Sequence, residues 1–379
     1  MDFDHSEERQ MLGDTITRWV MNDYPLKARL EAGVSELGYA PDRLAALAEL
    51  GVIGALFGED AGGFGGAGFD LAVVFEGLGK GLVIEPLLPA LLAGSVLENA
   101  GNDGQKALLE PVIEGAKTLA FAHFEADDGD DPRWIETTAK KGADGWDISG
   151  HKAVVRNGGA ADYLVVSART SGEAGQADGL SLFLVPSDAK GIETHAYSTI
   201  EGGSAAEISL DLKGLPMDCL IGDEGQGLDI LNQALGRGIV AIGAEALGIM
   251  DVIRAMTIEY IQTRKQFGVP IGKFQALQHR MAEMLLEIEQ MRSAVIRAAA
   301  VLEEPGVERE RAVAALKVTT NNTATLVAEE SIQIHGGIGM TWEHDLGHFA
   351  KRLTMITHEL GDEDYHLTRY IALGKGEHV

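Results

Sequence analysis

The spacing of hydrophobic residues changes twice along the chain and predicts three structural regions. In residues 1–117 apolar side chains recur at helical spacing, first in EERQMLGDTITRWVMNDY and then in APDRLAALAELGVIGALF. Pro41 or Asp42 is expected to begin the second of these helices, because both residue types favour a first helical turn. From residue 118 to 224 the apolar runs are short, β-branched and separated by Gly, Asn, Asp and Ser. That pattern predicts strands of a closed or sandwich-like β domain.

The helical pattern returns after Gly227 and continues to the end of the chain. Three stretches, at residues 230–267, 273–304 and 309–336, are long enough and periodic enough to form long helices. Each is too apolar to stand alone in water, so we expect residues 225–379 to form a helical bundle. The predicted fold class is therefore mainly α with a β domain, in the order helices, strands, helices.

Composition limits the classes of partner and compartment. The 379 residues include 31 Lys and Arg against 58 Asp and Glu, and the net charge of −27 argues against a nucleic-acid partner. Cys219 is the only cysteine, which excludes an intramolecular disulfide and fits a reducing cytoplasm. The sequence MDFDHSEERQ lacks the apolar core of a signal peptide, and no segment is apolar enough to span a bilayer. We expect a cytoplasmic protein without an integral membrane segment.

Two segments, at residues 264–284 and 332–352, combine charged or amide side chains with glycines. Arg264 and Gln266 have donors that pair with phosphate oxygens, and Gly336 and Gly337 let a ligand approach the main chain closely. This combination predicts a site for a long anionic cofactor of the flavin nucleotide type. The histidines of the second segment do not form a recognisable ligand set, so no metal is predicted.

The sequences of these segments, RKQFGVPIGKFQALQHRMAEM and IQIHGGIGMTWEHDLGHFAKR, resemble the two signatures of the acyl-CoA dehydrogenase family. The resemblance covers the whole chain and keeps the domain order of the family. It implies an N-terminal helical domain at 1–117, a middle β-barrel at 118–224 and a C-terminal four-helix bundle at 225–379. It also implies FAD as the cofactor.

The resemblance assigns cofactor contacts to the first segment. The residues that match Arg264 and Gln266 contact the FAD pyrophosphate of a neighbouring subunit in the family, which suits guanidinium and amide donors. Gln275 matches a position near the flavin nucleotide. Without the resemblance, Gln275 would be interpreted as an ordinary glutamine on a helix surface.

The second segment is assigned in the same way. Gln333, Gly336 and Gly337 match a stretch that runs along the adenosine diphosphate part of a neighbour's FAD. Gly336 and Gly337 also predict a helix C-cap, and the two roles are compatible. Because these contacts cross between subunits, the resemblance implies at least a homodimer and, as is usual in the family, a homotetramer.

Two segments of the β region depart from the family pattern. The family loop that passes hydroxyl and main-chain donors to the flavin ring is here FAHFEADDGDD, with Phe124 in place of a threonine and Ala126 in place of a proline. The stretch that packs on the flavin is Val154, Val155 and Arg156 instead of tryptophan, isoleucine and threonine. Arg156 either lies near the ring, where a cation favours the reduced anionic flavin, or points into solvent.

The resemblance implies a carboxylate that removes a proton from the carbon alpha to a thioester. Aligning Arg369 with the arginine that follows the base in the family places Asp362 at the base position. The neighbouring carboxylates remain alternatives: Glu359, Glu363 and Asp364. The other location that the family uses matches a position near Gly238, which has no carboxylate, and Glu245 is interpreted as a partnered helix glutamate.

The expected function is FAD-dependent dehydrogenation of an acyl-CoA thioester to an enoyl-CoA, with an electron-transfer flavoprotein as electron acceptor. The departures resemble those of a divergent bacterial subgroup, such as pimeloyl-CoA dehydrogenase small subunits. Two alternatives stay open. One is a non-catalytic half-site subunit of an α2β2 heterotetramer with a paralogous chain. The other is a related flavin oxidase that acts on nitroalkanes.

Overall fold

The computed structural model describes residues 6–126 and 130–376. Helices occupy the chain up to Ile113, strands lie between Leu119 and Ile221, and helices follow from Gly227 onward. This order confirms the predicted fold class. The N-terminal helices are α1 (Glu7–Asp23), α2 (Leu26–Gly33), α3 (Pro41–Glu49), α4 (Gly68–Gly79), α5 (Leu87–Ala100), α6 (Asp103–Lys106) and α7 (Leu109–Ile113).

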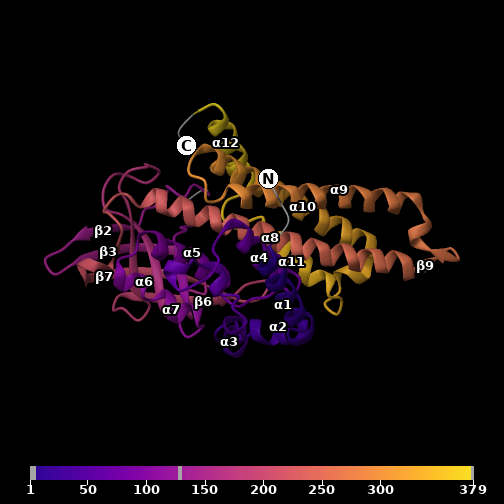
Figure 1. The fold of residues 1–379 in the computed structure, drawn as a ribbon, viewed down its shortest axis with the longest axis horizontal. Coiled ribbons are helices and arrows are strands. Elements are labelled where there is room, and N and C mark those ends of the chain that lie inside the picture. The colour runs from indigo at the N-terminus through magenta and orange to yellow at the C-terminus, as the bar shows by residue number, and fades with distance from the viewer. Residues whose placement is uncertain (1–5, 127–129, 377–379) are drawn as a thin grey trace. The chain divides into compact units, whose positions relative to one another are not determined.

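In the described ranges, eight strands follow the N-terminal helices, and the C-terminal helices come after them. The strands of the β region are β1 (Leu119–Ala122), β2 (Thr138–Lys141), β3 (Trp146–Arg156), β4 (Tyr163–Arg169), β5 (Leu180–Pro186), β6 (Ile192–Ser198), β7 (Ser204–Leu215) and β8 (Leu220–Ile221). The C-terminal elements are α8 (Gly227–Thr263), β9 (Lys265–Gln266), β10 (Val269–Pro270), α9 (Gln275–Val301), α10 (Val307–His335), α11 (Leu346–Ile356) and α12 (Glu363–Gly374). Figure 1 shows α8, α9 and α10 as the longest helices.

Local chemistry explains where several helices begin and end. The hydroxyl of Ser6 accepts the Arg9 N–H and caps α1, and Pro41 occupies the first turn of α3 as predicted. Gly336 ends α10 at a φ of +65°, which glycine adopts without strain. The helix predicted for residues 230–267 ends earlier, at Thr263, because the chain turns back at Gly268 and pairs β9 with β10.

Two compact units make up the chain, and they do not follow sequence order. The first comprises Met1–Leu26, Ala67–Val83 and Ile239–Val379, and the second comprises Lys27–Gly66 and Ile84–Gly238. The N-terminal helices are therefore divided between the two units. The domain limits at residues 117 and 224 stay a prediction.

The first unit is a helical bundle in which α4 packs closely on α8. A Cβ atom at Gly79 would lie 2.2 Å from the Glu245 carbonyl oxygen, and one at Gly248 would lie 2.1 Å from the Glu76 carbonyl oxygen. Only glycine permits two helix backbones to approach this closely. In the same unit α9, α11 and α12 all pack against α10.

The second unit is built on one eight-stranded sheet in the order β6-β7-β3-β2-β4-β5-β8, with β1 paired to β4 in parallel. Its core contains Trp146, whose ring meets that of Phe183 edge-on at 5.1 Å. The helix α5 packs on β1 and covers part of the sheet. Cys219 is buried against this core, and burial raises the pKa of its thiol to about 12.

Among the residues with described positions, no helix is both long enough and apolar enough to cross a membrane. The same residues contain no group of three or more His, Cys, Asp or Glu side chains arranged to hold a metal ion.

Candidate functional site

The structure brings the two signature segments together at the C-terminal ends of α8 and α10. The Tyr260 hydroxyl donates to the His335 carbonyl oxygen at 3.1 Å, and the two rings stack with centroids 4.4 Å apart. The His344 ring meets that of His335 edge-on at 5.1 Å. Arg264 follows Tyr260 by one helical turn, and Gly336 follows His335 directly. We call the segments 260–275 and 333–344 the bundle end.

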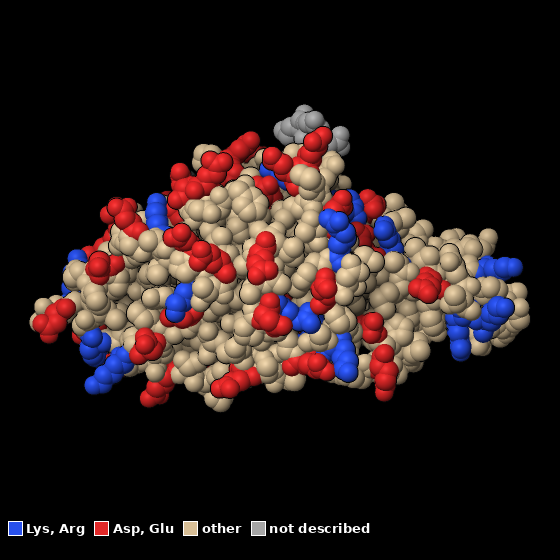
Figure 2. Space-filling view, turned by 60° about the horizontal axis from the view of Figure 1, so that its bottom comes forward, with Lys and Arg blue, Asp and Glu red and all other residues tan. Residues whose placement is uncertain are grey.

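Arg264 has a fixed main chain and an exposed side chain. Its N–H donates to the Tyr260 carbonyl at 2.8 Å, and its carbonyl accepts the Ile271 N–H at 2.9 Å. Within the described ranges the guanidinium has no hydrogen-bond or ion-pair partner, and the side chains of Lys265 and Gln266 are also exposed. Figure 2 shows blue side chains gathered at the end of the bundle where Figure 1 labels β9. A cluster of unpaired cations on an otherwise acidic surface suits an anionic ligand.

Gly336 and Gly337 face open space. A Cβ atom at either position would meet nothing within 4 Å. Gly336 needs its glycine for the positive φ, whereas Gly337 has an ordinary φ and no neighbour that excludes a side chain. The chain's own packing therefore does not explain the glycine at 337. Close approach of a ligand to the main chain does explain it.

The two glutamines assigned to the cofactor lie on exposed helix surfaces. Gln275 is the first residue of α9, directly after Phe274, whose ring meets that of Phe267 at 6.0 Å. Gln333 lies in the last turn of α10, three residues before Gly336. Both positions leave the amide groups available to a molecule outside this chain.

Asp362 lies in a separate place, at the start of α12. One of its carboxylate oxygens accepts the Tyr365 N–H at 2.8 Å and caps the helix. The two preceding residues have positive φ angles, +58° at Leu360 and +95° at Gly361. A branched residue in this region is strained, and strain of this kind is frequent at functional sites.

Hydrogen bonds hold the strained turn in place. His366 Nε2 donates to the Leu360 carbonyl at 2.8 Å, and burial lowers the pKa of His366 to about 4. The buried Lys317 donates to the Ile356 carbonyl at 3.2 Å and to Asn321 Oδ1 at 2.7 Å, which satisfies polar groups at the end of α11. The chain around Asp362 is therefore rigidly positioned.

The helix geometry separates Asp362 from the bundle end. Asn322 of α10 donates to the Glu363 carboxylate at 3.1 Å, so the start of α12 lies beside Asn322. From Asn322 to His335 there are 13 residues (335 minus 322). At 1.5 Å per residue the two places are about 20 Å apart along α10. The predicted site residues thus form two groups in one chain.

Two other carboxylates of this region, Glu245 and Glu359, are already engaged. Arg352 makes a buried bidentate pair with Glu245, at 2.6 and 2.7 Å, and a second pair with Glu359 at 2.5 Å. Glu245 is therefore the partnered helix glutamate that the sequence predicted. Glu359 is also paired with Arg352, and a carboxylate held in an ion pair is a poor candidate base.

The two segments of the β region that depart from the family pattern lie side by side. The Phe124 carbonyl accepts the Ala153 N–H at 2.9 Å. Next to this contact Lys152 is fully buried and donates to Glu125 Oε1 at 2.7 Å, to the His123 carbonyl at 2.9 Å and to Ser167 Oγ at 3.1 Å. We call His123, Glu125, Lys152 and Ser167 the buried cluster.

Glu125 is the acceptor at the centre of the buried cluster. Its carboxylate also accepts the Glu136 N–H at 2.7 Å and the Thr137 hydroxyl at 2.6 Å. Burial acts to raise the pKa of Glu125, but the charge and hydrogen bonds of Lys152 and Thr137 hold it below its ordinary value. The carboxylate is therefore charged and fully engaged.

Val154 lies at a bulge in β3, and Arg156 is the last residue of that strand. Val154 has a φ of +50° and is 58% exposed, although a β-branched residue is strained there. Arg156 does not point freely into solvent, because it pairs with the buried Glu201 at 2.5 Å. Its charge is neutralised in this way. One sequence signal points to the buried cluster, a lysine within the apolar alternation of β3, but it does not identify the partners of that lysine.

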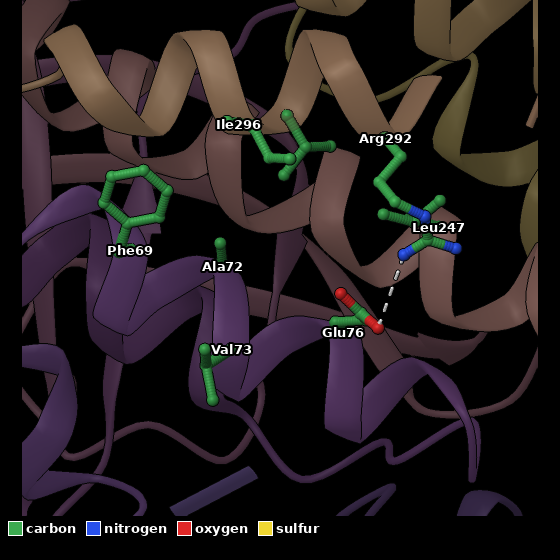
Figure 3. Close-up of a pocket in the computed structure, with 8 residues that line it drawn as sticks. Phe69, Ala72, Val73, Glu76, Leu247, Arg292 and Ile296 are labelled. Carbon is green, nitrogen blue, oxygen red and sulfur yellow. Dashed lines mark ion pairs between the residues drawn. The ribbon is translucent and has the colours of Figure 1, made fainter. Parts of the chain in front are cut away.

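A cavity of about 90 Å³ lies within the helical unit, and Figure 3 shows the side chains that line it. It lies between α4, α8 and α9 and is lined mainly by apolar side chains, with Arg292 and Glu76 paired at one side, 3.9 Å apart. None of the predicted site residues lines it. Ligand pockets usually enclose about 300–1,000 Å³, so this cavity does not fit a dinucleotide or a CoA thioester.

Comparison with known proteins places these features in a family. Residues 6–116, 120–211 and 225–372 match the models of the acyl-CoA dehydrogenase N-terminal, middle and C-terminal domains. The short-chain specific acyl-CoA dehydrogenase of Megasphaera elsdenii is 31% identical over 84% of this chain and 86% of its own.

Solved structures agree with this result. Butyryl-CoA dehydrogenase from Megasphaera elsdenii superposes with a TM-score of 0.88 at 26% identity and covers 98% of this chain and 99% of its own. The Tcur3481-Tcur3483 steroid acyl-CoA dehydrogenase variant gives a TM-score of 0.86 at 29% identity and covers 98% of both chains. The chain described above, with its joined signature segments and three matched domains, belongs to the acyl-CoA dehydrogenase family.

Proposed function

We propose that this protein catalyses the FAD-dependent α,β-dehydrogenation of an acyl-CoA thioester to an enoyl-CoA. The observation that carries the proposal is the bundle end, where Tyr260 and His335 join the unpaired Arg264 to the open backbone of Gly336 and Gly337. These groups fit a dinucleotide pyrophosphate, which is long and anionic. When bound, FAD supplies the acceptor for the hydride that leaves the beta carbon.

Asp362 is the base in this proposal. One carboxylate oxygen caps α12, and within the described ranges no hydrogen-bond partner occupies the other oxygen. The second oxygen can therefore remove the proton alpha to the thioester while the first keeps the side chain in place. The strained turn at Leu360 and Gly361, held by His366, supports a carboxylate that must not move.

The bundle end serves a neighbouring copy of this chain. The estimated separation of about 20 Å along α10 favours two different cofactors for Asp362 and for Gly336. We therefore propose a homo-oligomer, a dimer or tetramer, in which Arg264, Gln266 and Gln275 reach the FAD of the neighbour. Gln333 and the glycines extend the same contact.

The electron acceptor and compartment follow from the same proposal. We propose an electron-transfer flavoprotein as acceptor and the cytoplasm as location, which agrees with a surface of net charge −27 and a single buried cysteine. For the acyl group, one relative is named as short-chain specific and one solved structure as a steroid enzyme. A panel of CoA thioesters should therefore include short-chain, dicarboxyl, aromatic and steroid acyl groups.

Substitution of Asp362 tests the base. Asp362→Asn should bind FAD as the wild type does, but bleaching of the flavin by a CoA thioester should slow by about 10²–10⁴-fold. Asp364→Asn is the companion variant, because Asp364 is exposed in the same turn of α12 and is an alternative base. Bleaching by Asp362→Asn at the wild-type rate would place the base elsewhere, and slow bleaching by Asp364→Asn alone would assign the base to Asp364.

A half-site subunit of a heterotetramer is the second candidate. It is favoured by Phe124, which offers no hydroxyl, and by Arg156, whose charge is neutralised by Glu201. Under this alternative, Asp362 serves only to cap α12. The purified chain would then stay colourless after addition of FAD and acquire colour only with a paralogous partner. If the chain binds FAD and oxygen alone rapidly reoxidises the reduced flavin, the nitroalkane oxidase alternative is favoured instead.

A further inference from the structure

A buried arginine joins the turn before Asp362 to helix α8 of the same unit. The Nε and Nη2 groups of Arg352 donate to the Glu245 oxygens at 2.6 and 2.7 Å. Its Nη1 and Nη2 groups donate to the Glu359 oxygens at 2.5 and 3.3 Å. The three side chains are between 8% and 14% exposed. We call Glu245, Arg352 and Glu359 the arginine link.

The charges of the arginine link make it strong. Burial acts to lower the pKa of Arg352, but the charges of Glu245 and Glu359 hold it well above its ordinary value. The guanidinium therefore stays charged. Charge-assisted hydrogen bonds of an arginine fork are short and directional, and they are stronger in buried surroundings than in water. The link therefore fixes the relative positions of its two carboxylates.

The Glu245 end of the arginine link lies where two helices are in backbone contact. The Glu245 carbonyl oxygen would be 2.2 Å from a Cβ atom added at Gly79, so α4 touches α8 at this residue. Close-packed helices at such a contact have little room to shift relative to each other. The link is therefore anchored in the α4–α8 pair.

The Glu359 end holds the residue that precedes the strained turn. The Glu359 N–H donates to the Ile356 carbonyl at 3.2 Å, so Glu359 still belongs to the end of α11. Leu360 and Gly361 then take positive φ angles, and Asp362 follows as the N-cap of α12. Because only two residues separate Glu359 from Asp362, a shift of Glu359 is carried directly to the carboxylate of Asp362.

The contacts on the other side of Asp362 come from α12 itself. The Tyr365 N–H donates to the Asp362 carboxylate at 2.8 Å, and His366 Nε2 donates to the Leu360 carbonyl at 2.8 Å. These contacts fix Asp362 relative to α12, whereas the arginine link fixes the same turn relative to α8. A reacting carboxylate needs such placement, since a misplacement of about 1 Å can slow a reaction about 100-fold.

We propose that Arg352 and Glu359 are positioning residues for Asp362, because the arginine link holds the Asp362 carboxylate at a fixed place relative to α8. The inference rests on the proposed function, in which Asp362 is the base. Neither Arg352 nor Glu359 touches the thioester or the flavin. Loss of the link should therefore slow proton removal and leave the affinity for the thioester unchanged.

Two substitutions of Glu359 test the inference through the concentration dependence of flavin bleaching. Glu359→Ala removes the carboxylate, but Glu245 stays beside the buried Arg352 cation. Its maximal bleaching rate should fall about 100-fold at an unchanged half-saturating concentration of the thioester. Glu359→Gln can still accept a hydrogen bond from Arg352, so its rate should lie between those of Glu359→Ala and the wild type.

Asp251→Asn is the matched control. Asp251 lies in α8, as Glu245 does, and accepts hydrogen bonds from Arg292 of α9 at 2.9 and 3.1 Å. Glu289 lies 3.6 Å from the same guanidinium, so this variant also keeps a carboxylate beside the arginine. Because α9 does not carry the strained turn, Asp251→Asn should bleach at the wild-type rate.

Hydrogen exchange measures the turn without any reaction. The Tyr365 amide is protected by the Asp362 carboxylate, so its exchange reports whether that carboxylate keeps its place. In flavin-free Glu359→Ala this amide should exchange at least about tenfold faster than in flavin-free wild type, whereas the amides of α8 should be unchanged. Equal exchange at Tyr365 would overturn the inference.

The inference and the proposed function fail in different ways. If Asp362→Asn slows bleaching but Glu359→Ala bleaches at the wild-type rate, the inference alone is overturned. Weaker thioester binding in step with the slower rate of Glu359→Ala would show a merely structural role and would also overturn it. Equal rates in Glu359→Gln and Glu359→Ala would assign Glu359 a direct role in proton removal, against the inference. Bleaching by Asp362→Asn at the wild-type rate overturns the proposed base and the inference together.

Discussion

The bundle end and the buried cluster differ in how their charged groups are satisfied. At the bundle end Arg264 is exposed and has no partner in the described part of the chain, and a side chain at Gly337 would meet open space. In the buried cluster Lys152 is fully buried and all three of its N–H groups are engaged. Residues that bind another molecule make few contacts within their own chain, whereas the residues of a buried polar cluster make many hydrogen bonds to one another.

The comparison predicts opposite consequences for the two places. Substitutions at the bundle end should change cofactor binding and leave folding unchanged. Substitutions in the buried cluster should change folding, cofactor binding or both.

Removal of Lys152 should have the largest effect on stability. Lys152→Met leaves the Glu125 charge buried without its cation, which should lower the free energy of unfolding by about 3–5 kcal/mol. The measurement is urea denaturation of the flavin-free protein. In Glu125→Gln/Lys152→Met both charges are absent, and much of the loss should be recovered.

Lys27→Met is the control for this prediction, because Lys27 is an exposed lysine that pairs only loosely with Glu31 at 3.9 Å. It should show no resolvable loss of stability. An equally small loss in Lys152→Met would contradict the engagement of the buried cluster.

Removal of Arg264 should affect binding instead of folding. Arg264→Ala loses a charge-assisted contact worth about 1.5–3 kcal/mol, so FAD should dissociate about 10–100-fold more readily. The unfolding midpoint of the flavin-free chain should not change. Lys265→Ala, an exposed neighbour in β9, is the matched control and should bind FAD more tightly than Arg264→Ala.

The titration of His123 should make the free energy of unfolding depend on pH under mildly acidic conditions. The folded chain holds the pKa of His123 well below the ordinary value of 6.5, so the unfolded chain takes up a proton first as the pH falls. The titration of His123 therefore leaves the stability of the folded chain unchanged above pH 6.5 and decreases it below that pH, by about 1.4 kcal/mol per pH unit. Flavin-free His123→Leu should lose stability less steeply than wild type between pH 6.5 and 5. Parallel pH profiles would contradict a neutral His123 in the folded chain.

Gly337 should show the smallest effect on the chain itself. Gly337→Ala adds a methyl group in open space at an ordinary φ, so the free energy of unfolding should change by less than about 1 kcal/mol. FAD binding should nevertheless weaken, because the methyl group keeps a ligand away from the backbone. Unchanged affinity, measured by equilibrium dialysis, would mean that no ligand approaches there.

The sequence predicted the fold class because helical and strand periodicity are local properties. It placed the end of α8 wrongly, at residue 267 instead of Thr263, since the turn through Phe267 and Gly268 depends on pairing between β9 and β10. It identified the bundle end from signature motifs. The buried cluster was not predicted, because Glu125 and Lys152 are 27 residues apart and no local pattern indicates that they pair.

In the oligomer that we propose, the bundle end contacts a neighbour's cofactor and Asp362 acts at the chain's own cofactor. Co-expression of Arg264→Ala chains with Asp362→Asn chains tests it directly. In a mixed dimer, one site combines an intact Asp362 with an intact Arg264 from the neighbour. At an FAD concentration between the Kd of the wild type and the weaker Kd of Arg264→Ala, each variant alone should be nearly inactive toward a CoA thioester. The mixture should recover about a quarter of wild-type activity under random pairing. If mixed oligomers form but no activity returns, the two residues act on the same chain's cofactor and the account is wrong.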